Sequence, residues 1–402
     1  MPPVWVNMVQ RTQCSHLPDP WDATPVEQGL SVYYCPLLVG GVSFAVIEDR
    51  KWKSSPTVQI PQARIRNGWA QNRSYDASRD GDVPGAVLLG RRQLDFLEQW
   101  AADWSGDIWM KAVVSQTLFA NVATLPREDA MSGDITPRLR VLPPGEYAEG
   151  DVRVQDHDSN GWPQTGRNMA LERMRRGFAV HITGDQHLGS TIRYGIDEWG
   201  DAGYAIGVPA VANIWPRRWF PPPSEGGNRR PGAPFYTGDF RDGFGNKITV
   251  HAVSNPHTVE AEPTWINQRA PGYGIIVFNR ETRRITMSNW PRWVDPSAAG
   301  ARPYPGWPIT VDQMDNYDRR AVAYLPTLRV LGMQDPVVQI SNEAVGEIVY
   351  TIRIKGTTFR PRVFQHGRYS VRIGEPGTPR MKVVSHLEST PSTEDSRLVF
   401  AF

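Results

Sequence analysis

Residues 178–190 read FAVHITGDQHLGS, and this stretch decides how the rest of the chain is interpreted. The apolar run FAVHITG has the composition of a buried strand and ends in Gly184. Asp185 and His187 follow at once, before Gly189, and the flanking glycines permit sharp turns and close approach of a ligand. A carboxylate and an imidazole two residues apart on an extended segment point the same way, so both could bind a divalent or trivalent metal ion. The other interpretation is an aspartate that caps a loop beside a surface histidine.

The elements on the N-terminal side of this strand alternate between strands and helices. Strand patterns occupy 41–47 and 111–119, and apolar residues at helical spacing occupy 91–104 and 164–176. Gly177 follows the second helix, where a left-handed residue is expected. This order of elements predicts an α/β fold in which helices pack on a largely parallel sheet.

Strand patterns dominate the C-terminal side. Residues 204–214 either add a strand or line a cleft, and residues 272–287 have the pattern of a hairpin. The sequence pattern changes near 326–336. After this point, EIVYTIRI and RYSVRIG alternate apolar and polar residues without any helical pattern. Such short alternating strands predict a small antiparallel β-sandwich. We therefore predict one domain over 1–325 and an accessory β-sandwich domain over 335–402.

Composition excludes several classes of function. The 402 residues are 40% hydrophobic and 21% charged, which is typical of a globular protein, and 36 Gly and 35 Pro favour turns and β-structure. Basic and acidic residues nearly cancel to a net charge of +2, and no basic run forms a nucleic-acid patch. No apolar run is long enough for a transmembrane segment. Cys14 and Cys35 could pair or stay reduced, and nothing indicates an oligomeric state.

Three of the predicted strands end in polar groups: Glu48-Asp49-Arg50 after the first, Ser115-Gln116 within the second, and Asp185-x-His187 after the third. Ligands of open α/β sheets bind outside the carboxyl ends of the strands, so these groups are expected to converge. Arg50 could neutralise phosphate oxygens or form an ion pair with Asp49. His157 could donate a proton to a leaving group or be a solvated loop histidine.

Five stretches resemble the PhoD-type (alkaline-phosphatase-D-like) branch of the calcineurin-like metallophosphoesterases. They are VSFAVIEDRKWKS, LGRRQLDFLEQW, IWMKAVVSQTLFANV, the NGWPQTGR turn and HITGDQHLGSTIRYG, which occur in the family's order over about residues 30–220. The GD-x-H block is the most specific, and the resemblance implies that Asp185 and His187 are metal ligands. Asn160 stands where the family's W-D-G-Y-like block has an acid, which makes it a candidate catalytic residue with a changed side chain.

The resemblance implies an α+β sandwich of metallophosphoesterase type, of which this chain would hold the C-terminal part. The family's first ligand motifs should precede Val42, and residues 1–41 contain no such motif. The implied activity is metal-dependent hydrolysis of a phosphoester substrate, as by an alkaline phosphatase or phosphodiesterase. Metal ions would activate water, so no covalent nucleophile is needed. Calcium, iron, manganese and zinc would all fit this role.

Family members are commonly exported, so the resemblance also implies a periplasmic or extracellular location, although residues 1–13 lack the features of a signal peptide. Two other classes of function remain open. The chain could be a non-catalytic binding or structural module derived from such an enzyme, because its set of metal ligands is incomplete. It could also be a carbohydrate-active protein, which its 15 Trp would suit, but no paired carboxylates stand at strand ends.

Overall fold

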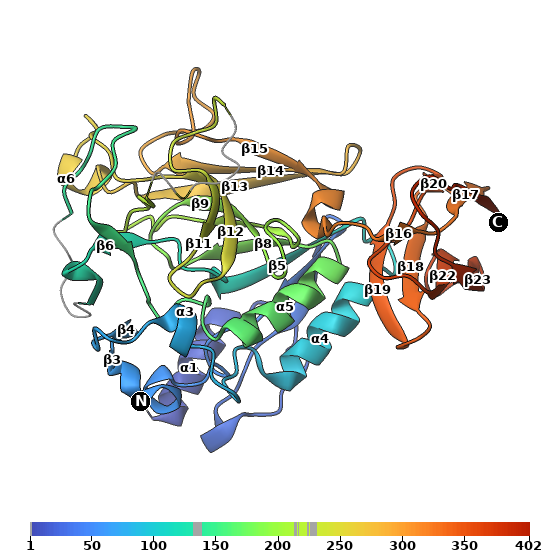
Figure 1. Cartoon of the computed structure of the whole chain (residues 1–402), viewed down its shortest axis with the longest axis horizontal. Coiled ribbons are helices and arrows are strands. Elements are labelled where there is room, and N and C mark those ends of the chain that lie inside the picture. The colour runs from blue at the N-terminus through green and yellow to red at the C-terminus, as the bar shows by residue number, and fades with distance from the viewer. Residues whose placement is uncertain (1, 132–138, 213–214, 216, 223–224, 226–230) are drawn as a thin grey trace.

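A mixed eight-stranded sheet forms the centre of the computed structural model, which describes residues 2–131, 139–212, 215, 217–222, 225 and 231–402 (Figure 1). In spatial order the strands are β1 (Cys35–Val39), β2 (Val42–Val46), β5 (Met110–Thr117), β8 (Val180–Gly184), β10 (Tyr204–Gly207), β9 (Ser190–Tyr194), β12 (Lys247–Val253) and β11 (Gly238–Arg241). Strands β2, β5, β8 and β10 are parallel, and the other four pairings are antiparallel. The predicted α/β class is confirmed, but the sheet is mixed because short loops return β10 beside β9 and β12 beside β11.

Two long helices cover one face of this sheet (Figure 1). In α4 (Gly90–Ala102), Leu94, Leu97 and Trp100 are buried in one core with Ala45 of β2 and Val113 of β5. Helix α5 (Gln164–Arg176) has the predicted bounds and packs beside α4. The other α-helices of the described residues are α1 (Pro3–Cys14), α2 (Pro56–Gln59), α3 (Ala77–Asp80) and α6 (Thr264–Asn267).

The prediction that Gly177 has a left-handed backbone conformation is wrong. Its φ of −98° is not left-handed, and the residue with positive φ is Phe178, at 53°. A Cβ on Gly177 would lie 3.2 Å from Cα and Cβ of Ala101 and 3.3 Å from Cδ of Lys111. Glycine therefore allows the end of α5 to approach α4 closely.

A smaller antiparallel sheet covers the opposite face (Figure 1). It consists of β13 (Gly272–Asn279), β14 (Arg284–Pro291) and β15 (Ile309–Asp312), so the predicted hairpin gains a third strand. Ile285 and Met287 of β14 are buried with Met110 and Ala112 of β5. Because successive residues of β5 point to opposite faces, the same strand also contributes Val113 to the core beneath the helices.

The C-terminal strands form three small sheets around a second core. These sheets are β19 (Glu347–Arg353), β18 (Val337–Asn342), β22 (Arg368–Gly374) and β23 (Met381–Glu388); β20 (Thr358–Phe359), β17 (Thr327–Leu331) and β24 (Arg397–Ala401); and β16 (Ala323–Tyr324) with β21 (Arg362–Val363). All pairings are antiparallel except β17 with β24. Elsewhere, β3 (Ile65–Arg66) pairs with β4 (Trp69–Ala70) and β6 (Thr124–Pro126) with β7 (Asp151–Arg153).

Arg353 joins the C-terminal strands to the end of α4. Its guanidinium donates to the carbonyl oxygens of Ile108 at 2.7 Å, Trp104 at 3.0 Å and Gly106 at 2.9 Å, and it forms a 2.8 Å ion pair with Glu375. The second core also includes side chains from before residue 180. The division into domains over 1–325 and 335–402 stays a prediction.

Two further observations concern the described residues alone. None of their helices is long and apolar enough to cross a membrane. Cys14 and Cys35 are both free thiols in this structure, so they do not form a disulfide with each other.

Candidate functional site

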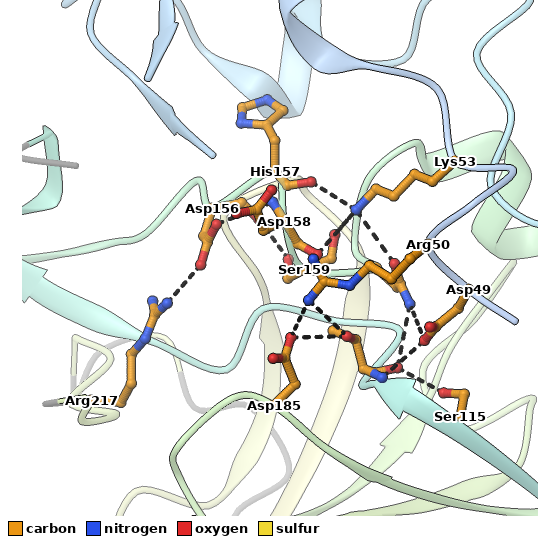
Figure 2. A network of polar contacts seen from close by, with 12 residues as sticks. Asp49, Arg50, Lys53, Ser115, Asp156, His157, Asp158, Ser159, Asp185 and Arg217 are labelled. Carbon is orange, nitrogen blue, oxygen red and sulfur yellow. Dashed lines mark hydrogen bonds and ion pairs between the residues drawn. The ribbon is translucent and has the colours of Figure 1, made fainter. Parts of the chain in front are cut away.

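The carboxyl ends of β2, β5 and β8 bring together Asp49, Arg50 and Asp185, part of the set of polar groups expected to converge at the strand ends (Figure 2). Arg50 follows β2, Thr117 ends β5 and Asp185 follows β8. The Arg50 Nη2 atom lies 2.7 Å from Asp185 Oδ2 and 3.4 Å from Thr117 Oγ1. The Thr117 hydroxyl donates to the same Asp185 oxygen at 2.9 Å. The alternative of an ion pair between Arg50 and Asp49 is therefore wrong, because the carboxylate that pairs with Arg50 is that of Asp185.

Arg50 and Asp185 remain in contact with solvent. Their side chains are 33% and 27% exposed, so the pair lies at the surface of the site rather than inside the core. Within the described residues, the buried Nε of Arg50 has no hydrogen-bond partner.

A buried carboxylate lies behind this pair. Asp49 is 1% exposed, and its Oδ2 accepts from the Thr117 N–H at 2.8 Å and from Asn160 Nδ2 at 2.7 Å. Burial raises the pKa of Asp49 to about 6, and the Thr117 N–H opposes that shift. Asn160 is also within 3.5 Å of the Thr117 carbonyl. Asn160 therefore holds the end of β5, and Thr117 links it to Arg50 and Asp185.

Lys53 organises the turn that contains Asn160, a role that was not predicted from the sequence. Its ammonium donates to the carbonyl oxygens of His157 at 2.7 Å, Ser159 at 2.8 Å and Asp158 at 3.1 Å, and to Asn160 Oδ1 at 3.3 Å (Figure 2). Burial, together with the positive charge of Arg50, lowers the pKa of Lys53 to about 8. Its position three residues after the Arg50 motif was the only available signal, because carbonyl partners leave no trace in side-chain patterns.

A second ion pair borders the same turn. Arg217 Nη2 lies 2.6 Å from Asp156 Oδ2, and both side chains are 7% exposed. Arg217 belongs to the NIWPRRWFPPP stretch, of which residues 213–214, 216 and 223 lie outside the described residues. Within the described residues, Nε and Nη1 of Arg217 have no hydrogen-bond partner. The sequence pattern of this stretch gave no sign of the pair.

The backbone of His157 is part of the turn that Lys53 contacts, but its ring points away from Arg50 and Asp185 (Figure 2). Nδ1 lies 3.0 Å from the Gln155 carbonyl and 3.2 Å from the Gly68 carbonyl, so it carries the proton, and Nε2 accepts from the Tyr75 hydroxyl at 3.1 Å. Burial lowers the pKa of His157 to about 4. The alternative of a solvated histidine is wrong, because the ring is fully buried. Its role as a proton donor stays a prediction, and this orientation does not support it.

Asp185 and His187 do not lie on an extended segment, as their spacing suggested. Both have positive φ, 66° and 54°, and His187 Nδ1 accepts from the Trp215 N–H at 3.2 Å. Across the described residues, no group of three His, Cys, Asp or Glu side chains is arranged to hold a metal ion. A guanidinium already occupies the Asp185 carboxylate, so the side chains present do not fit a metal centre by themselves. The metal role of both residues stays a prediction.

The comparisons with known proteins add one distant likeness. No family model matches the chain, and no curated protein matches it. A solved structure described as "Structure of PhoD" aligns with 97% of this chain at 10% identity and a TM-score of 0.39. The alignment covers 50% of that chain, so this chain spans half the length of the matched protein. At this level of similarity the fold rests on the strand pairings described above.

Proposed function

We propose that this chain is a phosphoester hydrolase whose phosphate-binding residue is Arg50. One observation carries the proposal: Arg50, Asn160 and Asp185 come from three separate stretches that resemble PhoD-type phosphoesterases, and they belong to one connected network. Arg50 and the Thr117 hydroxyl both donate to the Asp185 carboxylate. The Thr117 N–H and the Asn160 side chain both donate to the Asp49 carboxylate, so Thr117 connects the two groups. Convergence at the carboxyl ends of parallel strands is the usual position of a ligand site in such a sheet.

Arg50 is suited to bind and orient a phosphoryl group. Its guanidinium is permanently charged, planar and partly exposed. Lys53 adds a second positive charge close to Arg50, which lowers the energy of an anion there. Thr117, held by Asp49, fixes the position of the Asp185 carboxylate that Arg50 contacts.

Ester cleavage needs an activated water molecule, and in the resembling family a metal ion supplies that activation. The described residues do not provide a full set of ligands for such an ion, so no step is assigned to one. The same observation favours a second candidate function, a non-catalytic module that binds phosphoesters. In that function Arg50 would bind and release the ligand without hydrolysis.

Hydrolysis of p-nitrophenyl phosphate and bis-p-nitrophenyl phosphate separates the two candidates. The purified chain is assayed with chelator and, separately, with added calcium, manganese, zinc or iron, beside the variants Arg50→Met and Asp107→Asn. Asp107 is exposed and lies away from the network, so its variant serves as the control. A hydrolase releases p-nitrophenol in at least one condition and loses activity only in Arg50→Met. Phosphate binding without hydrolysis under every condition would establish the non-catalytic module instead, and binding unaffected by Arg50→Met would refute both.

A further inference from the structure

Three buried polar side chains of the central sheet form a relay of hydrogen bonds that ends at the candidate site. His181 of β8 and Tyr194 of β9 are fully buried, and Ser115 of β5 is 8% exposed. His181 Nδ1 lies 2.9 Å from the Tyr194 hydroxyl, and His181 Nε2 lies 2.9 Å from Ser115 Oγ. The Ser115 hydroxyl in turn donates to the Thr117 carbonyl at 3.0 Å. The relay therefore reaches the residue that connects the two carboxylates of the site.

The donors and acceptors of this relay all point the same way. Burial lowers the pKa of His181 to about 3, so at pH 7 its ring is neutral and carries one proton. Because a carbonyl oxygen can only accept, Ser115 donates its single proton to Thr117 and accepts from His181 Nε2. Nδ1 then accepts from the Tyr194 hydroxyl, whose oxygen accepts from the Phe119 N–H at 3.1 Å. Every hydrogen bond of the relay is therefore directed toward Thr117.

Strand β5 contains one extra residue at the point where the relay meets it. Val114 pairs with Ile182, and the next pair is Thr117 with Gly184, so three steps along β5 match two steps along β8. Such a β-bulge sends the side chains that follow it to the opposite face of the sheet. Thr117 therefore takes the place that the preceding residue would have in a regular strand, and its hydroxyl reaches the Asp185 carboxylate at 2.9 Å.

Ser115 lies within this bulge and at the edge of the network that contains the charged residues of the site (Figure 2). The extra residue of a bulge interrupts the ladder of backbone hydrogen bonds, so side-chain contacts help to define its conformation. Ser115 holds the Thr117 carbonyl, and Asp49 holds the Thr117 N–H at 2.8 Å. With its backbone held on both sides, Thr117 places Oγ1 3.4 Å from Arg50 Nη2.

We propose that Tyr194, His181 and Ser115 are positioning residues of the phosphate site, because they fix the bulge that presents the Thr117 hydroxyl to Arg50. The inference rests on the proposed binding of phosphate at Arg50. A guanidinium that Thr117 already holds needs little further ordering when it binds an anion, whereas a released guanidinium loses rotamer freedom on binding. This difference corresponds to about a fivefold change in phosphate affinity.

Titration calorimetry of inorganic phosphate in chelator tests the role in Tyr194→Phe and Ser115→Ala. Each variant removes one hydroxyl of the relay, and each should bind phosphate about fivefold more weakly than the native chain. Tyr350→Phe is the matched control, because its hydroxyl is also buried and donates to the Arg362 carbonyl at 3.0 Å in the second core. This control also loses one buried hydrogen bond and some stability, but it should bind phosphate like the native chain.

A double-mutant cycle separates positioning from a general effect on stability. Thr117→Val removes the hydroxyl through which the relay acts, so adding Tyr194→Phe or Ser115→Ala to it should weaken phosphate binding no further. A further loss in the double variants overturns the positioning role. Native affinity in both single variants, or an equal loss in Tyr350→Phe, overturns it as well.

Hydrogen exchange at the Thr117 amide, followed by NMR, gives a readout that does not depend on phosphate. In Tyr194→Phe and Ser115→Ala this amide should exchange about tenfold faster relative to that of Val113, which lies in the regular part of β5. The ratio of the two rates should stay native in Tyr350→Phe. A native ratio in both relay variants overturns the inference. A native chain that binds no phosphate overturns the proposed function instead, and exchange at Thr117 still decides whether the relay fixes the bulge.

Discussion

Replacing Asp185 by Asn distinguishes the ion pair in the structure from a metal ligand. The substitution removes the charge that Arg50 contacts at 2.7 Å while keeping the shape of the side chain. Both side chains are about one-third exposed, so the pair stabilises the fold by less than about 1 kcal/mol and the variant should fold. A carboxylate about 4 Å from a phosphate oxygen repels it by about 1 kcal/mol in water. Asp185→Asn should therefore tighten phosphate binding about fivefold.

The assay is titration calorimetry of inorganic phosphate in chelator at low ionic strength, with Asp107→Asn as the control. The gain should shrink as salt rises, because screening weakens interactions between exposed charges. If Asp185 instead holds a metal ion that binds the phosphate, the same substitution weakens binding strongly and added metal restores binding only to the native chain. That outcome would refute the competition between Asp185 and phosphate for Arg50.

Three further predictions concern the site and its support. Arg50→Lys should bind phosphate more weakly than the native chain but better than Arg50→Met, since lysine keeps the charge and loses the planar fork, and calorimetry ranks the three. The raised pKa of Asp49 means that the folded state binds the proton more tightly, so the free energy of unfolding should fall as pH rises from about 4 to about 6, by at most about 3 kcal/mol. Asp49→Asn should flatten that dependence in urea titrations, and an unchanged slope would exclude this carboxyl as its source. Arg353→Met removes the donors to three carbonyls and leaves Glu375 unpaired, so it should lower the free energy of unfolding by about 3–5 kcal/mol. Calorimetry should then show a lower melting temperature or two separate transitions. An unchanged melting profile would contradict the linking role of Arg353.

The local elements could be predicted because their signals are local. The bounds of α5 follow from apolar spacing within one helix, and β2, β5 and β8 follow from short apolar runs. The antiparallel part of the sheet could not be predicted in the same way. Which edge β12 joins depends on its pairing with β9, about 55 residues earlier in the chain, and not on its own pattern.

Only part of the candidate site could be predicted, because only some of its residues have a local signal in the sequence. The positions of Arg50 and Asp185 at strand ends were predicted correctly, but their direct contact spans 135 residues of sequence and has no local signature. The left-handed backbone at Asp185 and His187 also departs from the extended geometry that their spacing suggested, because the strand ends at Gly184. Arg217 could not be predicted as a partner of Asp156, since loop packing alone brings them together.

Lys53 gives the turn at residues 157–160 a cation that is part of the polypeptide. Four oxygen atoms lie 2.7–3.3 Å from its ammonium nitrogen, so the charge that orients these groups is attached covalently to the chain, whereas other loops use a bound calcium ion for this purpose. A covalently tethered cation cannot be removed by a chelator and does not depend on the supply of metal ions. The shape of this turn should therefore persist in environments where calcium-dependent loops lose theirs.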